Sequence, residues 1–235
     1  TVGALDTLGA LGTLGTVAVR LLNNDAAYGS VVAYAYRELG ALDRVHPVAG
    51  GRSGGTLVSV YGSGFLVDGA ARCRFASVVV PARVLSAGQL ECTSPLPAIA
   101  GYASVEVSMN GQDYSATGLH FEYQLPVAVR ALEPSRGPTE GGTFVNVTGS
   151  GFSARAALLG YVWCRFNRTS AAASWRSPSE LHCVSPRHAA GAASTEVTQN
   201  EQQHTSDGVR FEFEAVAAYS VQPATGPIAG GTRVE

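Results

Sequence analysis

One stretch of the sequence occurs twice in full and begins a third time. Residues 53–65 read Ser-Gly-Gly-Thr-Leu-Val-Ser-Val-Tyr-Gly-Ser-Gly-Phe, residues 140–152 read Glu-Gly-Gly-Thr-Phe-Val-Asn-Val-Thr-Gly-Ser-Gly-Phe, and a further copy begins at residues 229–234. The threonines of the three copies lie 87 and 89 positions apart. A fixed period of this size predicts tandem domains, each with a small core of its own, rather than one large fold.

Each complete copy contains a glycine turn, a short strand of alternating apolar residues and a second glycine turn closed by phenylalanine. Residues 51–55 also match the G-x-S-x-G pattern of hydrolase nucleophiles, with Ser53 in the serine position. The aligned position holds Glu140 in the second copy and Ala229 in the third. Ser53 is therefore interpreted as a turn residue, and the sequence predicts no catalytic residue.

Strand patterns are clear and helical patterns are weak along the whole chain. Leu119, Phe121 and Tyr123 alternate with polar residues, and Val162, Cys164 and Phe166 do the same in the second copy. This alternation is typical of sheets with one buried face. The chain has 28 glycines, 11 prolines and no convincing 3.6-residue apolar period. We therefore predict an all-β fold of tandem immunoglobulin-like β-sandwich domains.

The period divides the chain into two complete repeats and two partial ones. The complete repeats are predicted at residues 43–124 and 129–215, the back half of an earlier repeat at 1–40, and the start of another at 219–235. No assignment is made for residues 1–16, which are rich in Gly, Leu and Thr. The linkers between repeats are short and apolar, which favours a semi-rigid rod over flexibly joined domains.

Four cysteines form two pairs with the same spacing and context. Cys73 and Cys92 are 19 positions apart, and so are Cys164 and Cys183. Two cysteines per repeat are too few for a structural zinc site, and no Cys-x-x-Cys occurs. One disulfide per repeat is the simplest interpretation; it would stabilise each domain by roughly 3 kcal/mol and indicates an oxidising compartment. The alternative is two buried free thiols per repeat in a cytosolic protein.

Charge and metal-ligand patterns exclude several classes of function. The net charge is −2, and the 16 basic residues are all arginine and are scattered, so we expect no nucleic-acid partner. No apolar run approaches the roughly 20 residues of a membrane span, so we expect no membrane contact within this segment. The five histidines never show metal-ligand spacing, and we expect no metal or cofactor.

Two glycosylation sequons occur in the second repeat, at Asn146 and Asn167. Both asparagines occupy the outward phase of their strands, where a glycan would need to lie, and both are predicted glycosylation sites. Tyr61, Trp163 and Trp175 are either a contact patch for another chain or for sugar, or scattered surface aromatics.

With these features assembled, the repeats resemble IPT/TIG domains, the immunoglobulin-like modules of plexins, transcription factors and multi-repeat cell-surface proteins. The resemblance is carried by residues 134–138 and 223–227 before Gly-Gly-Thr, by the Val-x-Val strand, by Gly-Ser-Gly-Phe and by the paired cysteines. The first repeat departs from the pattern at residues 46–50, where the second proline is missing. The resemblance implies a fold and use in tandem, in adhesion or scaffolding, and it implies no reaction.

Our leading functional prediction is a non-catalytic extracellular structural or adhesion glycoprotein, a rod of IPT/TIG domains that mediates surface or filament assembly. Its expected partners are other protein chains, including copies of itself, and its expected location is the cell surface, such as a flagellar coat or cell wall. The alternative is the ligand-binding ectodomain of a plexin-like or fibrocystin-like receptor. A transcription factor and an accessory domain of a polysaccharide enzyme are further hypotheses.

Overall fold

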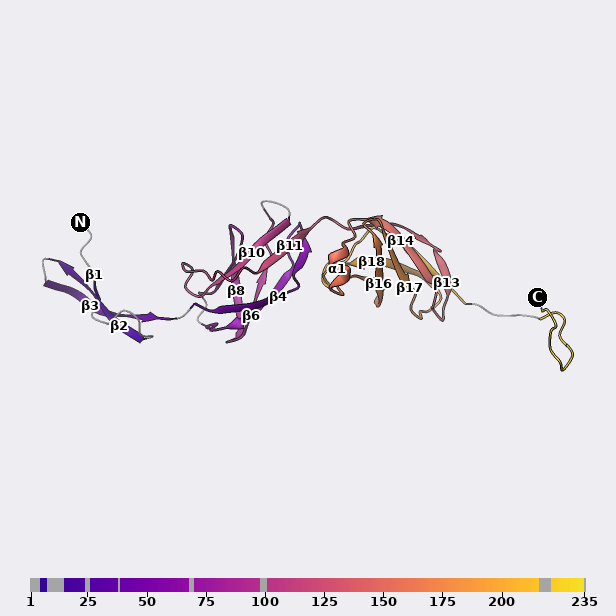
Figure 1. The fold of residues 1–235 in the computed structure, drawn as a ribbon, viewed down its shortest axis with the longest axis horizontal. Helices are drawn as coiled ribbons and strands as arrows, with labels where there is room; N and C mark the ends of the chain where they lie inside the picture. The colour runs from indigo at the N-terminus through magenta and orange to yellow at the C-terminus, as the bar shows by residue number, and fades with distance from the viewer. Residues whose placement is uncertain are drawn as a thin grey trace. The chain divides into compact units, whose positions relative to one another are not determined.

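A computed structural model describes residues 5–7, 15–23, 26–37, 39–67, 70–97, 101–215 and 221–234. The regular elements of the described residues are strands, apart from one helix of five residues (Figure 1). The strands make three sheets, one of three strands and two of eight. The predicted all-β fold is therefore confirmed.

The first sheet consists of β1 (Leu5–Thr7), β2 (Gly15–Asn23) and β3 (Ala26–Tyr36), paired antiparallel in that order. The interpretation of residues 1–40 as the back half of a repeat remains a prediction, and residues 1–4, 8–14, 24–25 and 38 of that range lie outside the described residues.

The second sheet is built from the first full repeat. Its strands are β4 (Ala41–His46), β5 (Ala49–Gly51), β6 (Leu57–Ser63), β7 (Arg72–Phe75), β8 (Val78–Ser86), β9 (Gln89–Thr93), β10 (Gly101–Ser108) and β11 (His120–Gln124). They pair in the order β4-β6-β9-β8-β7-β10-β11-β5. The consecutive strands β4 and β5 thus lie at opposite ends of the order, and β5 pairs parallel with β11. A chain that changes sheet in this way belongs to a sandwich.

The third sheet repeats this arrangement with the second full repeat. Its elements are β12 (Ala128–Glu133), β13 (Arg136–Pro138), β14 (Phe144–Ser150), α1 (Ala154–Leu158), β15 (Trp163–Phe166), β16 (Thr169–Ser177), β17 (Glu180–Val184), β18 (Gly191–Thr198) and β19 (Arg210–Glu214). The order β12-β14-β17-β16-β15-β18-β19-β13 matches that of the first repeat strand for strand. The sequence period therefore corresponds to a repeated β-sandwich.

Buried apolar residues form the core of each sandwich where the alternation predicts them. In the second repeat Val145, Val147, Cys164 and Phe166 are buried, and their strand neighbours are not. Cys164 is joined to Cys183, and in the first repeat Cys73 is joined to Cys92, with Cα atoms 6.4 and 6.3 Å apart. No described cysteine is free. Each disulfide lies inside its core, where it ties two strands together.

The repeated Gly-Gly-Thr motif has a packing reason at its first glycine. Gly141 has a φ of +80°, and a Cβ added there would lie 2.6 Å from the carbonyl carbon of Pro186. Gly54 is in the same situation against Pro95. A side chain would therefore be strained by the backbone angle and would also collide with the Ser-Pro segment that follows the second cysteine.

The second repeat has four more residues between Phe152 and Cys164 than the first has between Phe65 and Cys73, and the helix α1 lies in this longer segment. Ser153 caps its first turn, because its Oγ accepts a hydrogen bond from the Ala156 N–H at 3.2 Å. Ala156 is fully buried against the core of the repeat.

Residue contacts divide the chain into two compact units. The first comprises residues 1–46, 58–93 and 104–120, and the second comprises residues 47–57, 94–103 and 121–235. The second unit therefore combines the second repeat with three short segments, which include β5, β11 and the Gly-Gly-Thr turn of residues 54–56.

Candidate functional site

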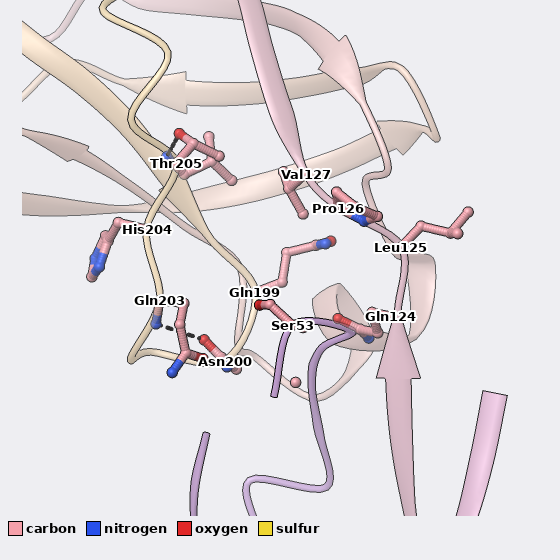
Figure 2. Close-up of a pocket in the computed structure, with 13 residues that line it drawn as sticks. Ser53, Gln124, Leu125, Pro126, Val127, Gln199, Asn200, Gln203, His204 and Thr205 are labelled. Atoms are coloured by element: carbon pink, nitrogen blue, oxygen red, sulfur yellow. Dashed lines mark hydrogen bonds between the residues drawn. The ribbon is translucent and has the colours of Figure 1, made fainter. Parts of the chain in front are cut away.

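A small pocket with a volume of about 190 Å³ lies within the second unit. Residues from three segments line it: Gly50, Gly51 and Ser53; residues 124–127; and Val197, Gln199, Asn200 and residues 203–205. Figure 2 shows Gln124 to Val127 on one side and Asn200 to His204 on the other, with Ser53 and Gln199 between them. Amide side chains dominate the polar lining, and no Asp, Glu or Arg is among the described residues that line the pocket.

Asn200 organises the loop that follows β18. Its Oδ1 accepts hydrogen bonds from the backbone N–H groups of Gln202 at 3.2 Å and Gln203 at 3.0 Å. An asparagine that bonds its own backbone two and three residues ahead fixes a tight turn. Asn200 is 5% exposed, so the side chain that fixes this turn is itself buried.

The turn directs two glutamine side chains onto residues 55–57 of the same unit. Gln202 bonds the Leu57 backbone twice, with Oε1 accepting from the N–H and Nε2 donating to the C=O, each at 2.8 Å. Gln203 accepts from the Thr56 hydroxyl at 3.0 Å and donates to the Gly55 C=O at 3.2 Å. We call these residues, Asn200, Gln202 and Gln203, the amide clamp.

A second group of bonds holds the start of α1 against the same pocket. The Gln199 Oε1 accepts from the Ser153 N–H at 2.5 Å, and its Nε2 donates to the Gly151 C=O at 2.9 Å. Gln124 donates to the Ser153 Oγ at 3.3 Å. The glycine turn that precedes α1 is thus held by side chains from two segments of the pocket lining.

The exposed side of α1 carries an ion pair within the second unit. Arg155 lies 3.5 Å from the Glu122 carboxylate, and its guanidinium donates to the Tyr102 hydroxyl at 2.5 Å. Because Glu122 belongs to β11, this pair links the helix to the strand that ends at Gln124. The described residues of the first repeat, 41–67, 70–97 and 101–124, contain no helix.

His204 is the titratable residue of the pocket lining. Burial is the main cause that lowers its pKa below 6.5, and the nearby Arg165 lowers it further. A neutral imidazole among amides can exchange hydrogen bonds but has no carboxylate of the lining to orient it as a base. Among the described residues, no group of three or more His, Cys, Asp and Glu could hold a metal. The chemistry of the site is therefore that of a neutral hydrogen-bonding surface.

The predicted glycosylation residues lie away from this pocket. Asn167 is exposed at the turn between β15 and β16, whereas Asn146 is half-buried in the middle of β14. Neither they nor the four cysteines line the pocket.

Trp175, one of the three aromatics interpreted as either a contact patch or scattered surface residues, is half-buried. Its indole packs against the core of the second repeat and donates to the Phe152 C=O at 3.0 Å. Tyr61 and Trp163 are also only half-exposed; the Arg44 guanidinium covers the Tyr61 ring at 3.7 Å, and Trp163 bonds the Gly160 C=O.

Sequence reasoning missed the amide clamp, although a signal exists. The segments 110–113 and 200–203, Asn-Gly-Gln-Asp and Asn-Glu-Gln-Gln, occupy the same place in the two repeats. Asn110 forms the same turn as Asn200, accepting from the N–H groups of Gln112 and Asp113. The asparagine that the two segments share predicts the turn. The glutamine two positions later, Gln112 or Gln202, is the signal for a side chain that extends away from the turn.

Comparison with known families identifies both repeats. The model of the IPT/TIG domain matches residues 41–123 and 126–213, more than half of the 235 residues. The chain belongs to the IPT/TIG domain family. The resemblance drawn from the sequence motifs is thereby confirmed.

The curated relatives of the chain include plexins. Mouse Plexin-B2 is 32% identical over 110 residues, which are 46% of this chain and 6% of that protein. Human Plexin-A4 is 26% identical over 194 residues, which are 77% of this chain and 10% of that protein. The chain therefore spans a tenth or less of the length of these relatives.

A solved structure of the full extracellular region of plexin A4, domains 1 to 10, has the same fold. The TM-score is 0.52 at 20% identity, over 78% of this chain and 16% of that one. In the part of the chain that the structure describes, no helix is long and apolar enough to cross a membrane.

Proposed function

We propose that the chain is a non-catalytic segment of the extracellular ectodomain of a plexin-like receptor. The observation that carries this proposal is the similarity to human Plexin-A4 over 194 residues, which covers 77% of the chain and therefore more than one repeat. The disulfides in both cores suit an oxidising extracellular location. The expected partners are other protein chains.

The geometry of the second unit suggests what such a segment contributes. The amide clamp and the Gln199 bonds join neutral groups, so salt affects them little. They hold the Gly-Gly-Thr turn, the linker and the following loop in one compact unit. We infer that the segment acts as a folded spacer and does not process a substrate.

The relatives favour the receptor over our leading sequence-based prediction, an adhesion or filament rod. The curated relatives reported above are plexins, and neither points to a flagellar coat or a cell wall. The shared part of both hypotheses, an extracellular non-catalytic array of IPT/TIG domains, is retained in the proposal.

Cell-surface staining and membrane extraction test the proposal. An antibody against residues 41–213 should label intact, unpermeabilised cells that express the full-length protein. The protein should also remain in the membrane fraction after an alkaline carbonate wash. Labelling only after permeabilisation would overturn the extracellular location, and release by carbonate would overturn the receptor and favour an assembled surface protein.

A further inference from the structure

The two sequons of the second repeat lie in different environments. Asn167 lies in the turn between β15 and β16, and Thr169 is the first residue of β16. Asn146 and Thr148 instead lie inside β14, which pairs with β12 on one side and β17 on the other. Their sequences alone rank them equally, because both are Asn-x-Thr with an outward-facing asparagine. The structure separates them.

Asn167 lies at an exposed turn whose shape does not depend on the asparagine. Its φ is 53°, and Ala76 at the same position of the first repeat has a φ of 52°. The left-handed conformation is easily adopted by asparagine and less so by alanine. Since the first repeat forms the same turn without a sequon, the turn alone does not require Asn at this position.

The hydrogen bonds of Asn167 leave its amide nitrogen open to modification. Its Oδ1 accepts from the Ser194 N–H at 2.9 Å and from the Ser194 hydroxyl at 3.3 Å. Its Nδ2 lies 3.1 Å from the His188 Nε2, while the His188 Nδ1 lies 2.7 Å from the Ala189 carbonyl oxygen. A glycan replaces one of the two Nδ2 hydrogens, so the oxygen and the second N–H keep these contacts.

Asn146 is shielded on the corresponding face. Its Oδ1 is buried, and no described residue donates a hydrogen bond to it. Across the strand pair it lies opposite His182, whose ring is 4.6 Å from that of Phe144. Arg176 and Glu180 also hold His182, at 2.9 and 3.2 Å. A first sugar on Asn146 would have to displace this cluster.

The third residues of the sequons differ in the same way. The Thr169 side chain is exposed at the start of β16. The Thr148 hydroxyl donates to the Ala131 C=O at 3.3 Å, which ties it to the neighbouring strand β12.

We propose that Asn167 carries an N-linked glycan in the folded protein and that Asn146 does not. In the transfer, the Asn167 Nδ2 bonds to the anomeric carbon of an oligosaccharide carried on a lipid diphosphate. The bond from that carbon to the diphosphate oxygen breaks, the lipid diphosphate leaves, and the amide loses one proton. The inference rests on the proposed extracellular location, since this chemistry occurs in the secretory pathway.

Mass spectrometry of the full chain, secreted from eukaryotic cells behind an added signal sequence, tests the proposal. Enzymatic removal of N-glycans in ¹⁸O-water converts a glycosylated asparagine to labelled aspartate. We expect the label at residue 167 and unmodified asparagine at residue 146. A label at residue 146 in the disulfide-bonded protein, or none at residue 167, overturns it. Because secretion is imposed, this result is independent of the native location, which the antibody experiment tests separately.

A matched set of variants tests the site without disturbing Asn167. Thr169→Val removes the sequon and places there the residue that the first repeat has, Val78. It should abolish the glycan-dependent mobility shift, whereas Thr169→Ser should retain it. Thr148→Val should leave the shift unchanged. Loss of the shift in Thr148→Val but not in Thr169→Val would overturn the assignment.

Discussion

The side chain of Gln202 forms two hydrogen bonds of 2.8 Å with the backbone of Leu57, one accepted from its N–H and one donated to its C=O. A single amide thus satisfies both polar groups of the residue that begins β6. Both residues belong to the second unit, in which this pair ties the loop after β18 to the residue that follows the Gly-Gly-Thr turn.

Replacing Gln202 should loosen the start of β6. We expect Gln202→Ala to lower the free energy of unfolding by about 1 kcal/mol, because two partly solvated hydrogen bonds are lost. The Leu57 amide should exchange its hydrogen faster in native-state exchange measurements. Gln112→Ala is the matched control, since Gln112 has the aligned position in the first repeat and is exposed. If the Leu57 amide exchanges at the same rate in Gln202→Ala, the bonds from Gln202 do not stabilise the start of β6.

Removing a disulfide should destabilise the repeat that contains it. The double variant Cys164→Ala/Cys183→Ala opens a loop with a sequence separation of 19 residues, and we expect a loss of roughly 3 kcal/mol in urea unfolding. Cys73→Ala/Cys92→Ala should cost a similar amount in the first repeat, where the separation is the same. If all four cysteines of the native protein react with a thiol reagent without prior reduction, the protein has no disulfides, and the argument for an oxidising location is also refuted.

The Tyr123 hydroxyl should make the protein sensitive to alkali. Tyr123 is 4% exposed, no described residue bonds its hydroxyl, and burial raises its pKa from 10.0 to about 12. The folded state therefore holds the phenol proton more tightly than the unfolded state does. Stability should be unaffected below pH 10 and should fall by about 1.4 kcal/mol per pH unit between pH 10 and 12.

Two separate substitutions test this prediction, since the residue aligned with Tyr123 in the second repeat is Phe213. Tyr123→Phe should remove this alkaline loss and leave the neutral-pH stability equal or higher, because an unbonded buried hydroxyl disappears. Phe213→Tyr should cost about 1 to 3 kcal/mol at neutral pH for burying a new one. Urea unfolding between pH 8 and 11 separates the variants. If Tyr123→Phe loses as much stability above pH 10 as the unchanged protein does, a group other than Tyr123 causes that loss.

Much of the fold could be predicted from the sequence because the deciding interactions are local or periodic. The alternation around Cys164 gives a strand with one buried face, and the equal spacing of the cysteines gives the pairing. Period-2 burial and repetition at fixed intervals need no knowledge of tertiary contacts.

The features that could not be predicted depend on contacts between distant segments. The amide clamp joins Gln202 to Leu57, 145 positions away, and no periodic pattern marks such a pair. Asn146 lies in the predicted outward phase, but cross-strand neighbours such as His182 cover that face. Strand alternation gives the direction of a side chain, whereas its exposure depends on what the adjacent strands place beside it.

His204 should make the second repeat sensitive to mild acid. Burial and then Arg165 lower its pKa, so the unfolded state binds the proton more readily than the folded state. Its contribution to stability is complete above pH 6.5 and is lost as the pH falls below that value. The aligned residue in the first repeat is Tyr114, over whose ring the Arg74 guanidinium lies at 4.1 Å.

Two substitutions distinguish the charge of His204 from its packing. His204→Tyr and His204→Gln should both lower the difference in urea midpoint between pH 7.5 and pH 5, because neither residue gains a proton there. Only His204→Tyr should gain stability at pH 7.5, since Arg165 can then stack on the ring as Arg74 does on Tyr114. A pH difference that persists in both variants would mean that another group, and not His204, senses the acid.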